Sequence, residues 1–85
     1  MPIEAKISIF DPTVGGYRDA SLENTAKYLE RMAELAEEVV GKEDTDKLLV
    51  YDPSRDVFLE APVSVINACL ATVPAVQAAY DEYSE

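Results

Sequence analysis

The stretch IFDPT at residues 9–13 returns in altered form as VYDPS at residues 50–54. Both copies place an aromatic residue, Asp-Pro and a hydroxyl residue in the same order, 41 positions apart. Proline presets the φ angle of a turn, and aspartate can accept hydrogen bonds from the backbone that follows it. Since β-favouring residues precede each copy, the sequence predicts two strands that each run into a tight turn.

The same offset continues on both sides of the two turns. Residues 7–29 align with residues 48–70 without a gap. The aligned pairs beyond the turns include Tyr17 with Phe58, Asp19 with Glu60, Ala20 with Ala61 and Leu29 with Leu70. We therefore expect return strands at 17–20 and 57–61, which makes each copy a strand, turn, strand unit; chance similarity is the alternative.

A helix is expected after each hairpin. Apolar residues recur at three- and four-residue steps over about 21–40, with Ser21 placed as the N-terminal cap and Gly41 as a left-handed stop. A second apolar stripe covers about 62–83. Because Pro74 removes a backbone hydrogen bond inside that stripe, we expect either a kink near 70–74 or two shorter helices.

These elements predict one small α+β domain over residues 1–85. Its sheet is expected to be antiparallel, with three to four short strands and two helices on one face. If the repeat is real, the fold is a duplicated β-β-α unit, with copies at 6–40 and 47–83. If the repeat is accidental, the order β-α-β-β-α with three strands remains.

Composition narrows the classes of function. The chain carries 17 acidic and 7 basic residues, a net charge of −10, and no histidine. We therefore expect no direct nucleic-acid binding, no metal site and no cofactor. We also expect no window with the roughly 18 apolar residues of a membrane span and no N-terminal leader, which indicates a cytoplasmic protein.

No nucleophile or acid pair stands out, so we do not expect an enzyme. Asp11 and Asp52 are explained by turn formation, and Cys69 lies in an apolar run that favours burial. The glycine pair at 15–16 lacks the lysine and hydroxyl of a phosphate loop. A small enzyme would need acids such as Asp52 and Glu60 to converge in a cleft.

Two groups of residues are candidates for binding a partner. Phe10, Tyr51 and Phe58 are expected on the sheet face away from the helices, either as an interface or as part of the core. Four carboxylates, those of Glu30, Glu34, Glu37 and Glu38, crowd one side of the first helix, either as a solvated face or as a binding surface. The candidates for binding among them are Glu34, Glu37 and Glu38.

The resulting hypothesis is a non-enzymatic protein-binding module. It describes a small acidic inhibitor or adaptor, in one version encoded by a phage or plasmid, whose carboxylates imitate phosphates and block the basic channel of a nucleic-acid-binding protein. The alternative is a self-associating assembly protein that forms a homodimer through the aromatic sheet face.

Overall fold

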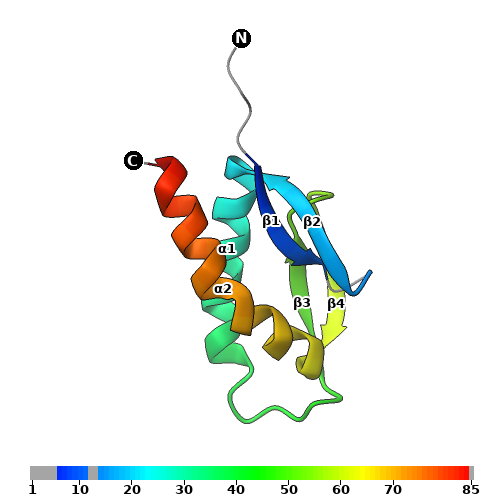
Figure 1. The fold of residues 1–85 in the computed structure, drawn as a ribbon. Coiled ribbons are helices and arrows are strands. Elements are labelled where there is room, and N and C mark those ends of the chain that lie inside the picture. The colour runs from blue at the N-terminus through cyan, green and yellow to red at the C-terminus, as the bar shows by residue number, and fades with distance from the viewer. Residues whose placement is uncertain (1–5, 12–13, 85) are drawn as a thin grey trace.

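The computed structural model describes residues 6–11 and 14–84, so the first Asp-Pro turn lies outside the described residues. Its elements follow in the order β1 (Lys6–Asp11), β2 (Gly16–Ser21), α1 (Leu22–Glu38), β3 (Lys47–Asp52), β4 (Val57–Pro62) and α2 (Val63–Ser84). Figure 1 shows two hairpins lying beside a pair of helices that pack against each other. The α+β class is confirmed.

The two hairpins have the same register at an offset of 41 residues. In the first, the paired positions run from Lys6 and Ser21 to Asp11 and Gly16. In the second, each pair is found 41 positions later, from Lys47 and Pro62 to Asp52 and Val57. The two helices also begin 41 residues apart, at positions 22 and 63.

The prediction of a single sheet with three to four strands is wrong. The described strands form two separate two-stranded antiparallel sheets, β1 with β2 and β3 with β4, and the β-α-β-β-α order is also not observed. The side chain of Arg31 gives a physical reason at β3, because it donates two hydrogen bonds to the Leu49 carbonyl. An edge that is already bonded to a helix side chain is closed to another strand there.

Each helix contacts strands of both hairpins. α1 packs on β1, β2 and β3, and α2 packs on β1, β3 and β4. The core lies between these layers and is formed by apolar side chains from all six elements. Its buried members are Ile7, Ile9, Ala20, Tyr28, Met32, Leu35, Val50, Tyr51, Ala61, Ile66, Cys69 and Val76.

The helix boundaries follow local signals. Ser21 caps α1 by accepting a hydrogen bond from the Asn24 backbone N–H at 3.2 Å. The helix ends at Glu38, somewhat earlier than expected, and Gly41 has the predicted positive φ of 79°. α2 is one helix with Pro74 inside it, and Figure 1 shows its axis bending between the gold and orange parts.

The absence of an apolar window of membrane length is a second prediction that the structure corrects. Residues 63–83 of α2 are long and apolar enough, by length and composition alone, to cross a membrane. The expectation failed because 61–80 contains no charged residue, although its many alanines make it only weakly apolar. Such a helix is also typical of a soluble core, but only 22% of its most apolar window is buried.

Candidate partner-binding groove

A groove of about 570 Å³ lies between α1 and the second hairpin. We call it the α1–β3 groove. It is lined by Lys27, Glu30, Arg31, Glu34, Leu49, Tyr51, Asp56 and Phe58. Three of the six residues predicted to bind a partner, namely Glu34, Tyr51 and Phe58, therefore share one surface.

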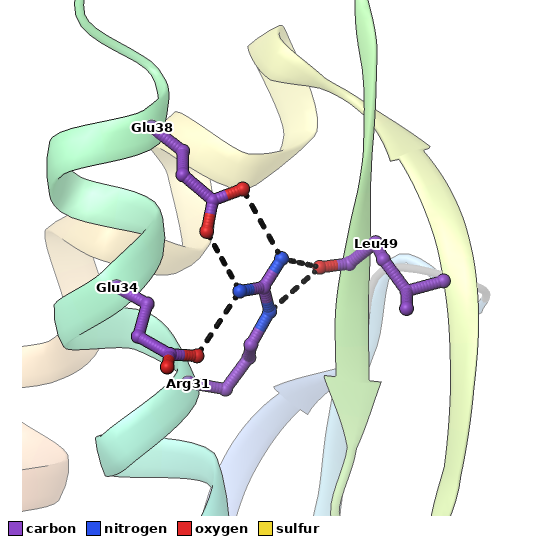
Figure 2. A network of polar contacts seen from close by, with 4 residues as sticks. All are labelled: Arg31, Glu34, Glu38 and Leu49. Carbon is purple, nitrogen blue, oxygen red and sulfur yellow. Dashed lines mark hydrogen bonds and ion pairs between the residues drawn. The ribbon is translucent and has the colours of Figure 1, made fainter.

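Arg31 lines this groove, and Figure 2 shows its guanidinium group between the two α1 glutamates and the Leu49 carbonyl. Its Nε and Nη2 atoms donate to the Leu49 carbonyl at 2.9 and 2.7 Å, which ties α1 to the edge of β3. The same guanidinium pairs with Glu38 at 2.8 Å and with Glu34 at 3.1 Å. Because only 17% of the Arg31 side chain is exposed, these contacts hold it as a fixed part of the groove wall.

The apolar part of the groove comes from the second hairpin. Phe58 is 58% exposed and Leu49 is 46% exposed, whereas Tyr51 is buried. The rings of Tyr51 and Phe58 are 5.1 Å apart, and the Tyr51 hydroxyl donates to Asp56. Burial and the Asp56 carboxylate both raise the pKa of Tyr51, which keeps its hydroxyl protonated. The buried ring of Tyr51 thus packs against the exposed ring of Phe58.

The open question of interface or core is answered differently for each aromatic residue. Tyr51 belongs to the core, since it is buried and its hydroxyl donates to Asp56, so it does not lie on an uncovered sheet face. Phe58 is exposed, as an interface residue would be. Phe10 is partly buried in the other hairpin, edge-to-face with Tyr17 at 5.8 Å, and lies outside the α1–β3 groove.

The predicted carboxylates are also divided by the structure. Glu34, Glu37 and Glu38 are all exposed on α1, but only Glu34 lines the groove. Arg31 pairs with both Glu34 and Glu38. Its pair with Glu34, three residues along the helix, is the ion pair expected from the sequence. The contact of Arg31 with Leu49 was missed, because no local pattern links positions 18 residues apart.

A second groove, of about 480 Å³, lies between α2 and the first hairpin. We call it the α2–β1 groove. It is lined by Lys6, Ile7, Ser8, Tyr17, Ala71, Thr72, Ala75, Val76, Ala79, Glu82 and Tyr83. Five of these positions lie 41 residues from a residue that lines the α1–β3 groove: Ala71 from Glu30, Thr72 from Arg31, Ala75 from Glu34, Ser8 from Leu49 and Tyr17 from Phe58.

The two repeated aspartates are engaged in the hairpins. Asp11 pairs with Arg18 at 3.0 Å and Asp52 pairs with Arg55 at 2.8 Å, and both carboxyl groups are buried. Burial raises the pKa of Asp52, but hydrogen bonds from Ser54 and Arg55 outweigh it, so that the pKa lies below its ordinary value. The hydrogen bond from the Ser54 backbone agrees with the turn-forming role expected of Asp52, whereas the turn expected after Asp11 includes residues 12–13, which lie outside the described residues.

Other sites for chemistry are limited within the described part of the chain. Burial raises the pKa of Cys69 to about 11, so the thiolate is scarce at neutral pH. Among residues 6–11 and 14–84, no group of three or more acidic, histidine or cysteine side chains is placed to hold a metal ion. Comparison with protein-family models, curated proteins and solved structures found no match for this chain.

Proposed function

We propose that this protein is a non-enzymatic protein-binding module, an acidic inhibitor or adaptor that engages a basic partner through the α1–β3 groove and the acidic side of α1. The observation that carries the proposal is the exposure of Phe58 and Leu49 beside the carboxylates of Glu30 and Glu34. Aromatic residues are enriched at protein interfaces, where polar groups form the rim around them.

The charges of the groove favour a partner rich in lysine or arginine. Lys27 contacts Asp56 at 3.8 Å and Arg31 is shared between two glutamates, so the basic groups of the groove are compensated. With a net charge of −10, the whole chain attracts a basic surface and accelerates the encounter. The apolar side chains then supply contacts that salt does not weaken.

A narrower version is that the partner is a nucleic-acid-binding protein. Glu30, Glu34, Glu37 and Glu38 place carboxylates along about two turns of α1. Such a row can occupy a channel that binds phosphates, and its binding weakens steeply as salt rises. The buried, unreactive Cys69 supports a reducing compartment such as the cytoplasm.

The experiment is affinity capture from a cell lysate with matched variants. Phe58→Ser removes the exposed ring of the α1–β3 groove, and Tyr17→Ser removes the ring at the corresponding position of the other groove. A basic protein retained by the wild type and by Tyr17→Ser, lost with Phe58→Ser and weakened by salt supports the proposal. Equal retention by all three proteins, or retention of acidic proteins only, contradicts it.

The carboxylates need a separate variant with its own control. Glu34→Gln with Glu37→Gln keeps the size of both side chains and leaves the Arg31–Glu38 pair intact. We expect the captured partner to bind the double variant at least about tenfold more weakly at low salt. Glu43→Gln with Asp44→Asn removes the same charge from the 41–46 connector, so an equal loss there would assign the effect to net charge alone.

We further propose that the chain is a duplicated β-β-α unit. Support comes from the shared hairpin register, the helix starts 41 residues apart and the five corresponding positions in the two grooves. The grooves have diverged in charge, since Arg31 and Glu34 correspond to Thr72 and Ala75. We therefore assign binding of a basic protein to the α1–β3 groove, which is built from α1 of the first copy and the hairpin of the second.

A further inference from the structure

The α2–β1 groove lacks a counterpart of the Arg31 side chain that joins helix to strand in the α1–β3 groove. At the position that corresponds to Arg31, the hydroxyl of Thr72 donates to the Cys69 carbonyl of its own helix at 2.7 Å. Alanines stand where Glu34 and Glu38 are found in the other half, at 75 and 79. The short side chains leave a groove whose walls are mainly apolar, with two exposed tyrosines, Tyr17 and Tyr83.

Within the described part of the chain, the lining of this groove also carries no net charge, on a strongly acidic protein. Among the described lining residues the charged ones are Lys6 and Glu82, which have opposite signs. No charged residue occurs in 61–80, whereas the net charge of the chain is −10. A basic partner therefore gains little electrostatic attraction at this groove, in contrast to the acidic side of α1.

We propose that the α2–β1 groove is a homodimer interface whose occupant is α2 of a second copy. Two copies with a charge of −10 each repel one another on acidic faces, so a neutral apolar face is where they can meet. In a twofold arrangement the same surface appears on both sides, so Lys6 of each copy can lie opposite Glu82 of the other. Homodimer contacts are typically more apolar than the remaining surface.

The geometry of α2 limits the strength of this dimer. Figure 1 shows the orange-to-red part of the helix at the edge of the molecule, with α1 and β1 on its other side. The part of α2 that lines the groove, residues 71–83, is about 20 Å long and about 10 Å wide, which gives a contact of only about 200 Å² per copy before β1 and the tyrosines are added. Because stable dimers bury about 800 Å² per partner, only a weak dimer is expected, with a dissociation constant between about 1 μM and about 1 mM.

The test is sedimentation velocity on the full chain from about 1 μM to about 1 mM, which spans that range of affinity. Ala75→Glu places a charge in the groove, and Gln77→Glu places the same charge on an exposed position of α2 outside it. The wild type and Gln77→Glu should dimerise, and Ala75→Glu should raise the dissociation constant at least about 100-fold because the twofold repeats the buried charge.

Three results would overturn the proposal. The first is a wild type that stays monomeric throughout, and the second is an equal effect of the two variants. The third is binding of the wild type, but not of Ala75→Glu, to phosphatidylcholine vesicles without dimerisation in solution, which would assign the face to lipid. Circular dichroism and thermal melting of each variant at low concentration confirm that it is folded. Thr72→Ser changes the groove without adding a charge, and this variant is expected to dimerise like the wild type.

Discussion

Replacing Arg31 by methionine is expected to destabilise the fold by about 2 kcal/mol. Loss of the two hydrogen bonds that Arg31 donates to the Leu49 carbonyl accounts for about 1 kcal/mol, since water can donate to that carbonyl in the variant. Loss of the pairs with Glu34 and Glu38 adds about 0.5 kcal/mol each, because both glutamates are substantially exposed. Methionine retains most of the packing of the arginine stem.

In a domain of this size, about 2 kcal/mol corresponds to a decrease of roughly 8–16 °C in Tm. Urea denaturation followed by circular dichroism measures the free energy of unfolding directly. The matched control is Arg31→Lys, which keeps the charge but loses the fork that reaches Leu49 and Glu38 together, so we expect a loss of about 1 kcal/mol.

Salt separates the two contributions to the effect of Arg31. At about 1 M salt the Debye length is about 3 Å, so the ion pairs with the glutamates weaken while the hydrogen bonds to Leu49 persist. We therefore expect Arg31→Met to cost about 1 kcal/mol under those conditions. A loss below about 0.5 kcal/mol at low salt would show that Arg31 does not fix α1 to the edge of β3.

Three further predictions concern buried groups. Because the folded pKa of Asp52 lies below the ordinary carboxyl value of about 3.9, its contribution to stability is complete above that pH and is lost as pH falls through the folded pKa. Asp52→Asn should thus flatten the acid side of a urea-midpoint profile and lower stability at pH 7, and an unchanged profile would contradict this. Cys69, with a pKa of about 11, should react with N-ethylmaleimide at pH 8 only as fast as the protein opens, so labelling at the rate of a free thiol would refute its burial. The buried Tyr28 hydroxyl lies near Cys69 and Thr72. Within the described part of the chain, no group has the distance and angle to Tyr28 that a hydrogen bond requires. Tyr28→Phe should leave stability unchanged or raise it by up to about 1 kcal/mol in a thermal melt, whereas a clear loss would reveal a partner for the hydroxyl.

Local patterns predicted the elements of this fold well. The Asp-Pro turns, the flanking β-favouring residues and the offset of 41 gave four strands in the right places, and Ser21 and Gly41 marked the ends of α1 closely. These signals act over a few residues, so they can be read from the chain itself. The pairing of the hairpins with each other depends on contacts far apart in sequence, and there the expectation of one sheet failed.

The candidate site was predicted only in part for the same reason. Exposed aromatic and acidic residues could be identified by type, and the structure brings Phe58 and Glu34 into one groove. The sequence left Tyr51 open between interface and core, because alternation along β3 points it away from Val50, yet both residues are buried. The strand is covered by α1 on the side that alternation assigns to solvent, which no period-two pattern can reveal.

The two grooves show how one backbone arrangement can present different chemistry. At position 31 a long side chain spans from the helix to the strand edge, and two carboxylates balance its charge. At position 72 a short side chain turns back to its own helix, and alanines replace the carboxylates. Because Tyr28 and Cys69, also 41 residues apart, are both buried where the helices pack, the exchange of side chains around them changes the surfaces and leaves the core intact. The acidic residues of α1 thus lie beside one groove, whereas 61–80 carries no charge, so the two proposed interfaces can be altered independently.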